Sequence, residues 1–242
     1  KADAGRVMWE GQQVQISSPN VARKLGVGMV FQHFSLFDAL TVEENITLGI
    51  SPELTKDDLA GRIREVSLQY GLPLDPGRYV HTLSVGERQR IEVVRCLLQD
   101  PSLLIMDEPT SVLTPQEVDE LFKTLRRLSE EGVSILYISH KLEEIKALCH
   151  TATIMRMGEV VAECTPGNET ARSMAEMMMG ANLVSPERTD RQTDGSVKLE
   201  LRDLTAVSAH HHGTDLKNIN LKVRAGEIMG IAGIAGNGQR EL

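Results

Sequence analysis

The residues best placed to do chemistry are two adjacent carboxylates, Asp107 and Glu108, which follow the apolar run 103–106 and precede Pro109. A short apolar run bounded by prolines is typical of a strand buried on both faces of a parallel sheet. Open α/β sheets bind ligands at the carboxyl ends of such strands. There an aspartate can hold Mg²⁺ on a nucleotide while the next carboxylate deprotonates an attacking water. A strand that simply ends in acidic turn residues is the alternative.

A possible phosphate site lies upstream, at the start of a predicted helix. Apolar residues recur at helical spacing from Ile91 to Leu98, and Ser84 with Glu87 forms a capping box before them. A helix N-terminus with free backbone N–H groups, a hydroxyl and a close-approach glycine, Gly86, also suits a γ-phosphate. Capping alone remains the structural alternative.

A second apolar run, 134–138, predicts another buried strand, and His140 follows it. The segment between the two strands predicts a helix that begins after Thr114 and ends at Gly132. Strand, helix and strand form a β-α-β unit with parallel strands. We therefore expect His140 to lie beside Asp107 and Glu108 at one edge of the sheet.

The order of these motifs resembles the nucleotide-binding domain of an ABC ATPase, over most of residues 1–180. The resemblance implies an α/β fold of the P-loop NTPase type, with a mostly parallel sheet, a helical subdomain at about 41–100, and ATP with Mg²⁺ as ligands. By resemblance, the site residues are Gln32, which contacts Mg²⁺ and water; Ser84, Val85, Gly86 and Glu87 of the signature motif; Asp107, which holds Mg²⁺; Glu108, the general base; Ser111 of the D-loop 111–114; and His140, the switch histidine near the γ-phosphate.

The signature departs from the family's usual Leu-Ser-Gly-Gly-Gln at two positions, where Val85 replaces a glycine and Glu87 replaces the glutamine. A carboxylate at Glu87 suits the helix dipole but repels a triphosphate. We therefore expect weaker nucleotide contact at this motif.

A glycine-rich loop near the end of the chain has the glycine spacing of a P-loop and follows the strand-like run 227–232. A working P-loop places Lys on the phosphates and Ser or Thr on Mg²⁺, whereas Gln239 and Arg240 stand at those positions here. The backbone could still bind phosphate, but hydrolysis there should be poor. A plain glycine-rich turn is the alternative, and a dinucleotide fingerprint is disfavoured by Glu241. The candidate nucleotide-binding residues are Gly233, Gly236, Asn237, Gly238, Gln239 and Arg240.

Together, the motifs resemble the duplicated ATP-binding subunits of bacterial nucleoside and simple-sugar ABC importers. The resemblance implies a transport-coupled ATPase at the cytoplasmic, inner face of the cell membrane. Its partners would be membrane permease subunits, a solute-binding protein and a second ATPase domain in the same chain. The alternatives are a catalytically inactive fragment with only a binding or structural role, and a soluble ABC protein without a membrane partner.

The expected domains are a first ATPase domain at 1–180 without its N-terminal strands and P-loop, a polar linker at 181–196, and the start of a second ATPase domain at 197–242. The formal net charge of −8 argues against a nucleic-acid partner. The three cysteines lack the spacing of a metal or disulfide site.

Overall fold

The computed structural model describes residues 2–180, 195–208, 213–233, 237–239 and 241–242. The chain divides into two compact units, residues 1–183 and 184–242, and each is described by itself. The domain boundaries expected from the sequence stay a prediction, and most of the expected linker, 181–194, lies outside the described residues.

The first unit alternates strands and helices. Its strands are β1 (Val7–Trp9), β2 (Gln12–Val14), β3 (Val27–Val30), β4 (Leu103–Asp107), β5 (Ser134–Ile138), β6 (Ala152–Arg156) and β7 (Glu159–Cys164). Its α-helices are α1 (Pro19–Lys24), α2 (Val42–Gly49), α3 (Leu59–Gln69), α4 (Val85–Leu97), α5 (Pro115–Glu130), α6 (Leu142–Leu148) and α7 (Ala171–Met179). Short 3₁₀ turns occur at Pro52–Thr55, Val80–Thr82 and Pro166–Asn168.

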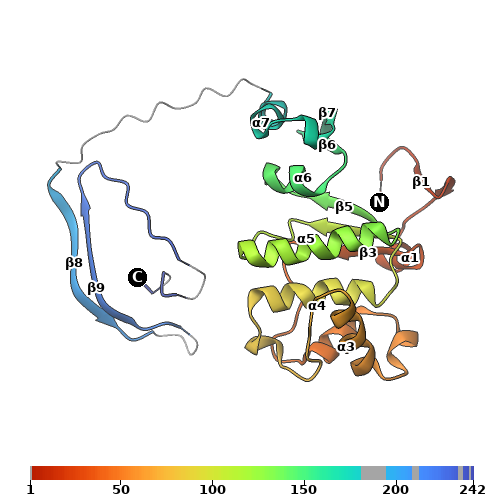
Figure 1. The fold of residues 1–242 in the computed structure, drawn as a ribbon, viewed down its shortest axis with the longest axis horizontal. Helices are drawn as coiled ribbons and strands as arrows, with labels where there is room; N and C mark the ends of the chain where they lie inside the picture. The colour runs from red at the N-terminus through yellow and green to blue at the C-terminus, as the bar shows by residue number, and fades with distance from the viewer. Residues whose placement is uncertain (1, 181–194, 209–212, 234–236, 240) are drawn as a thin grey trace. The chain divides into compact units, whose positions relative to one another are not determined.

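The strands that carry the predicted site residues form one sheet. Among the described residues it has three strands, in the order β3, β4, β5, and both pairings are parallel. In the register, Val30 faces Met106 and Asp107 faces Ile138. All three strands therefore end at the same edge of the sheet (Figure 1). The predicted β-α-β unit is confirmed as β4, α5 and β5.

The predicted helix starts are also confirmed. Ser84 caps α4 and Thr114 caps α5, and each forms a complete capping box with the glutamate three residues later, Glu87 or Glu117. Each box satisfies backbone N–H groups that the first turn of a helix leaves without partners. The start of each helix is therefore fixed by local hydrogen bonds, independently of what the helix packs against.

The core lies between one face of the sheet and the helices α4 and α5, which run alongside each other in Figure 1. Leu104 and Met106 of β4 are fully buried there. The opposite face is more open, because Leu136 is 51 % and Ile138 is 44 % exposed. Burial on both faces, predicted for 103–107, is wrong for the face of β4 that carries Leu103 and Ile105, which are only half-buried. The buried strand predicted at 134–138 is also wrong, because no residue of β5 is buried. Side chains alternate along a strand, and the buried core lies on the face that carries Leu104 and Met106.

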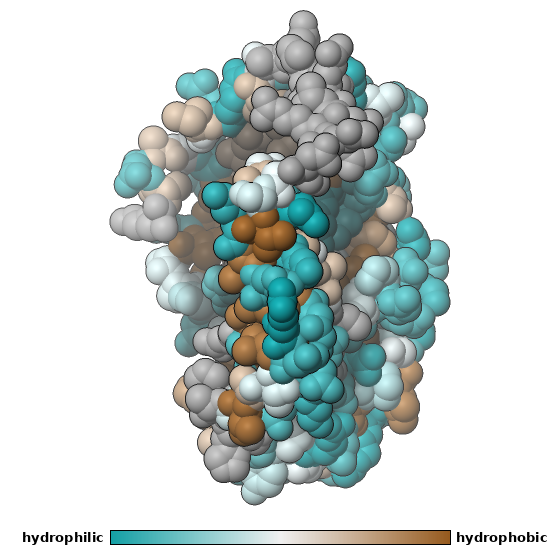
Figure 2. Space-filling view, turned by 90° about the vertical axis from the view of Figure 1, so that its left-hand side faces the viewer, coloured by the Kyte–Doolittle hydropathy of each residue, from teal (hydrophilic) through white to brown (hydrophobic). Residues whose placement is uncertain are grey.

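The second unit contains a long antiparallel hairpin of β8 (Val197–Ala206) and β9 (Leu216–Arg224). Figure 2 shows apolar side chains scattered among hydrophilic ones on the face toward the viewer. The strand expected at 227–232 is wrong, since these residues have no regular secondary structure. Ile228 is 99 % and Ile231 is 56 % exposed, so no described sheet buries the side chains of this apolar run.

Candidate active site

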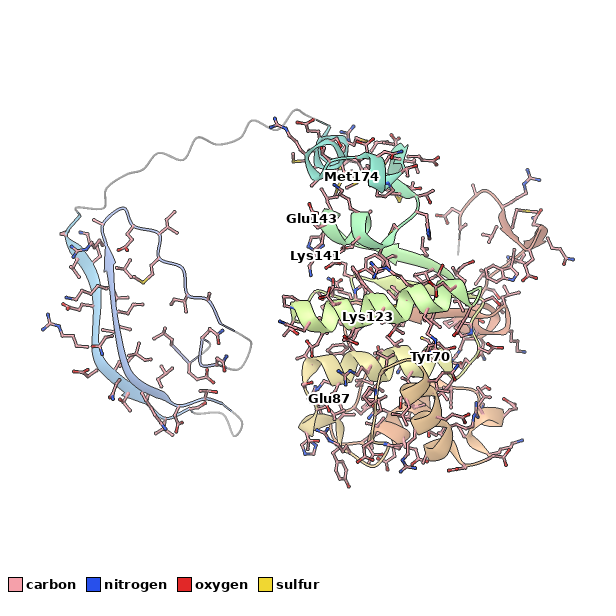
Figure 3. The ribbon with its side chains drawn as sticks, viewed as in Figure 1. Tyr70, Glu87, Lys123, Lys141, Glu143 and Met174 are labelled. Atoms are coloured by element: carbon pink, nitrogen blue, oxygen red, sulfur yellow. The ribbon has the colours of Figure 1, made fainter. Side chains whose placement is uncertain are left out.

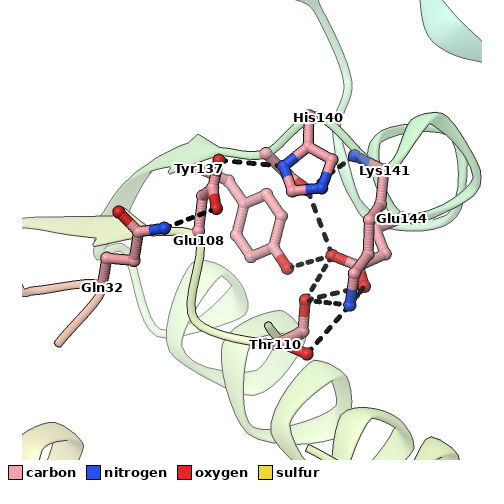
Figure 4. Close-up of polar contacts among 8 residues, drawn as sticks. Gln32, Glu108, Thr110, Tyr137, His140, Lys141 and Glu144 are labelled. Atoms are coloured by element: carbon pink, nitrogen blue, oxygen red, sulfur yellow. Dashed lines mark hydrogen bonds and ion pairs between the residues drawn. The ribbon is translucent and has the colours of Figure 1, made fainter. Parts of the chain in front are cut away.

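Glu108 lies at the centre of the predicted site, between Gln32 and His140 (Figure 4). The Gln32 Nε2 donates a hydrogen bond to Glu108 Oε2 at 2.9 Å, and His140 Nδ1 lies 2.9 Å from Glu108 Oε1. These residues are far apart in the sequence, and each stands just beyond the end of a different strand of the sheet. The structure therefore brings together the three residues that the sequence analysis named as catalytic.

The backbone of Glu108 adopts an unusual conformation, with φ of 45°. For a residue with a Cβ atom, this left-handed conformation costs about 1–2 kcal/mol. Its N–H donates to the carbonyl oxygen of Ile138 at 2.9 Å, which extends the pairing of β4 with β5 beyond the last strand residue. Such strain persists only where the surrounding structure holds it, and it is concentrated at functional sites.

The exposure of the site fits chemistry on a ligand from solvent. The Glu108 side chain is 25 % exposed and that of His140 is 63 % exposed. Asp107 ends β4 and is partly exposed, and no described residue donates a hydrogen bond to its carboxylate. Asp107 ends β4, and Gln32 follows the neighbouring strand β3. Carboxylate and amide oxygens are the type of donor that Mg²⁺ prefers. These residues therefore fit a magnesium ion carried by a nucleotide.

Within the part of the chain that the structure describes, no three His, Cys, Asp or Glu side chains cluster as a protein-only metal site would require. Ser111, predicted in the D-loop, donates its N–H to the carbonyl oxygen of Glu108 at 3.2 Å. Ser111 is exposed, so its hydroxyl is accessible from outside the unit.

The signature motif, Ser84 to Glu87, forms the first turn of α4. Glu87, labelled in Figure 3, accepts the Ser84 N–H at 2.8 Å and forms an ion pair of 2.6 Å with Arg78. Partial burial acts to raise the pKa of Glu87, but the hydrogen bonds from Ser84 and Arg78 outweigh it and hold the pKa below its usual value. The negative charge expected to weaken nucleotide contact is thus largely engaged within the protein.

Gly86 of the signature lies against the start of α5. A Cβ atom at this position would come within 1.8 Å of Glu117 Oε1, so only glycine fits without movement of the carboxylate. Glu117 is the capping residue that follows the D-loop. The signature turn and the D-loop side of α5 are therefore in direct contact.

The ion pair at Glu87 predicts a specific response to pH. A group whose folded pKa is lowered contributes stability above its unfolded pKa, near 4.3, and loses that stability as the pH falls through the folded value. Below about pH 4.3 the wild-type chain should therefore lose more thermal stability than a Glu87→Gln variant. Melting temperatures of both proteins between pH 3 and 6 test this. Parallel curves over that range would contradict it, and Glu53→Gln, at an exposed position, serves as the control.

The glycine-rich loop near the end of the chain is only partly described, since Gly236 and Arg240 lie outside the described residues. Gly238 has φ of 96°, which favours glycine, and Asn237 precedes it in a bend. A Cβ atom at Gly233 would lie 2.3 Å from Gln239 Nε2, so the Gln239 side chain lies against Gly233. The binding role of this loop stays a prediction.

The sequence analysis missed a partly buried polar cluster next to the site. The Glu144 carboxylate on α6 accepts hydrogen bonds from Thr110 at 2.7 Å and Tyr137 at 2.8 Å, and Lys141 lies 3.2 Å away. Burial acts to raise the pKa of Glu144, but the hydrogen bonds from Thr110, Tyr137 and Lys141 hold it below the usual value. The sequence carried one signal of this cluster, a glutamate four residues after His140, but spacing alone did not reveal its partners.

The sequence analysis also missed a contact that holds the segment after Gln32 against α4. The buried Glu92 of α4 accepts the N–H of Ser35 at 3.0 Å and forms an ion pair with Arg95. This anchors the segment that follows β3 to the helix that begins with the signature motif. The sequence could have indicated this contact through Glu92, a glutamate among the apolar positions of the predicted helix.

Comparison with known proteins identifies the family. Residues 1–111 match the ABC transporter family. The chain is 41 % identical to a nucleoside import ATP-binding protein of Lactococcus lactis, over 98 % of this chain and 48 % of that protein. It is 36 % identical to a guanosine import ATP-binding protein of Bacillus subtilis, over 99 % of this chain and 48 % of that protein. The chain thus spans about half the length of the relatives it matches.

Solved structures agree on the fold. An ABC transporter protein, cbiO1 of Clostridium perfringens, matches with a TM-score of 0.58 and 26 % identity, over 73 % of this chain and 70 % of that one. An ATP-binding cassette in its ADP conformation matches with a TM-score of 0.62 and 24 % identity, over 74 % and 78 %. Among the described residues, no helix has the length and apolar character needed to cross a membrane. The predicted fold class is confirmed, and the chain contains an ABC transporter ATP-binding domain.

Proposed function

We propose that this chain forms part of an ABC importer subunit that binds and hydrolyses Mg·ATP to drive uptake of a nucleoside or a simple sugar. The observation that carries the proposal is the contact of Glu108 with both Gln32 and His140. A carboxylate held on both oxygens has a fixed orientation, as a general base needs.

The chain's own residues supply distinct parts of the reaction. Glu108 accepts the proton of the attacking water. His140 orients Glu108 through Oε1 and stands at the edge where the γ-phosphate is expected, and Gln32 holds Oε2. Because phosphoryl transfer depends mainly on positioning and electrostatics, holding these groups in place is the protein's main contribution.

Magnesium would be held by Asp107 with help from the Gln32 amide oxygen, and it would neutralise charge on the nucleotide phosphates. The signature motif would contact a nucleotide bound to a partner domain. Ser84 keeps the α4 N-terminus ordered for that contact, while Arg78 balances the Glu87 charge. Gly233–Arg240 is proposed to bind nucleotide weakly through its backbone.

Transport coupling is proposed from the relatives, whose names describe nucleoside, guanosine and ribose import. The proposed partners are membrane permease subunits, a solute-binding protein and a second ATPase domain, with the protein at the inner face of the membrane. Closure of two ATPase domains around ATP would change the permease, and hydrolysis would release it.

The test is solute-stimulated hydrolysis by the full-length protein. We expect the protein, reconstituted in vesicles with its permease and solute-binding protein, to hydrolyse Mg·ATP. The rate should rise several-fold with either a nucleoside or ribose as the solute. The same complex without solute is the control. Hydrolysis that no nucleoside or sugar stimulates would contradict the importer assignment, and absence of hydrolysis in the whole complex would contradict the ATPase assignment.

A further inference from the structure

One carboxylate connects the two segments that carry the proposed catalytic residues. Glu144 is on α6, the helix that begins two residues after His140. Both Glu144 oxygens lie 2.7 Å from the Thr110 hydroxyl, and Thr110 is two residues after Glu108 and only 1 % exposed. The contact therefore joins the loop that follows Glu108 to the helix that follows His140 (Figure 4).

Further bonds reinforce this connection. Glu144 also accepts from the Tyr137 hydroxyl at 2.8 Å and from the Ser139 hydroxyl at 3.3 Å. The Lys141 ammonium donates to the Thr110 carbonyl oxygen at 2.9 Å and pairs with Glu144 at 3.2 Å. Ser139 and Lys141 flank His140 in the sequence. The residues on either side of the histidine are thus joined to the loop that follows Glu108 through one largely buried carboxylate, that of Glu144.

The contacts of Glu144 hold the segment on the C-terminal side of the strained residue Glu108. Glu108 has φ of 45° and is held on its N-terminal side by the bond of its N–H to Ile138. On its C-terminal side, Pro109 leads directly to Thr110, whose side chain and carbonyl oxygen are both bound by the cluster. A strained residue keeps its conformation only when its flanks are fixed on both sides.

We propose that Glu144 is a positioning residue, which holds Thr110 so that Glu108 stays in its left-handed conformation and in contact with His140. Glu144 does not touch the nucleotide in this arrangement. It acts through Thr110 on the base and through the segment 139–141 on the histidine. The functional consequence rests on the proposed ATPase activity, whereas the conformational one does not.

The first test compares two glutamates that are adjacent in α6. Glu144→Gln in the full-length complex should lower kcat for ATP hydrolysis about tenfold to a hundredfold, because small displacements of catalytic groups cost this much. KM for Mg·ATP should stay within about twofold, since binding groups are untouched. Glu143→Gln is the matched control, at an exposed position of the same helix turn (Figure 3). It should leave both constants within about twofold.

A second pair of variants covers the case in which Glu144→Gln does not fold. Thr110→Ser keeps the hydroxyl and should retain most of the activity, whereas Thr110→Val has nearly the same shape without the hydroxyl and should lose kcat as Glu144→Gln does. If the two residues act through one contact, the double variant Thr110→Val with Glu144→Gln should fall little below the worse single variant. Full additivity of the two losses would contradict the proposal.

A structural readout separates this inference from the proposed function. A crystal structure of the Glu144→Gln protein should show Glu108 outside the left-handed region or separated from His140, whether or not the protein hydrolyses ATP. An unchanged Glu108 conformation would overturn the inference. It would also be overturned if Glu144→Gln and Thr110→Val both kept wild-type kcat while Glu108→Gln abolished hydrolysis. Absence of hydrolysis in the wild-type complex would instead contradict the proposed function.

Discussion

Replacement of Glu108 by glutamine is expected to lower kcat for ATP hydrolysis by about 10²–10⁴-fold, the contribution typical of a general base. The amide has nearly the same shape as the carboxylate and can still bond with Gln32 and His140, so the local structure should persist. It cannot accept the proton of the attacking water. ATP binding should therefore remain while turnover stops.

Single-turnover hydrolysis and equilibrium nucleotide binding of the full-length complex measure these two effects separately. Glu130→Gln, at an exposed position near the end of α5, is the control for loss of a carboxylate and should behave as wild type. If Glu108→Gln retained more than about a tenth of the wild-type kcat, the base would have to be another group. Loss of binding together with turnover would show that the variant disturbs the site as a whole.

The second large effect is expected in the core. Leu104 is fully buried in the central strand β4, where it packs between the sheet and the helices above it. Leu104→Ala should lower the free energy of unfolding by about 2–5 kcal/mol, because the lost transfer energy adds to the cost of the cavity. Urea denaturation of the 242-residue chain, followed by circular dichroism, measures this change.

A leucine on the neighbouring strand provides the matched control. Leu136 of β5 lies on the opposite face of the sheet and is 51 % exposed. Leu136→Ala should cost about 1 kcal/mol or less, since little apolar area leaves a packed environment. Equal losses for the two variants would mean that both faces of the sheet are buried in solution, contrary to the structure.

Much of the candidate site could be predicted because it depends on local patterns. The apolar runs at 103–106 and 134–138 became parallel strands, and the capping boxes at Ser84 and Thr114 begin α4 and α5 as expected. Parallel strands bring their carboxyl ends to one edge, which is why Glu108 and His140 could be placed together without knowledge of side-chain contacts. The resemblance to ABC ATPases supplied the place of Gln32.

Predictions failed where the outcome depended on what covers an element. The apolar character of 134–138 and 227–232 suggested burial, but Leu136 and Ile228 are exposed. A run of apolar residues records a tendency to be buried and does not specify the surface that buries it. For 227–232 no described strand supplies backbone hydrogen bonds either, so no strand forms.

The sequence by itself determined the strands at 103–107 and 134–138, the capped starts of α4 and α5, and the kind of domain, since these depend on spacing within a few residues and on the order of motifs. Only the tertiary structure decided that Arg78 neutralises Glu87, that Gly86 contacts Glu117, and that Glu144 binds Thr110. Ionic and hydrogen-bonded contacts of this kind need side chains within about 3 Å of each other. Such distances are set by the packing of helices against a sheet, and that packing does not appear as a spacing pattern in the sequence.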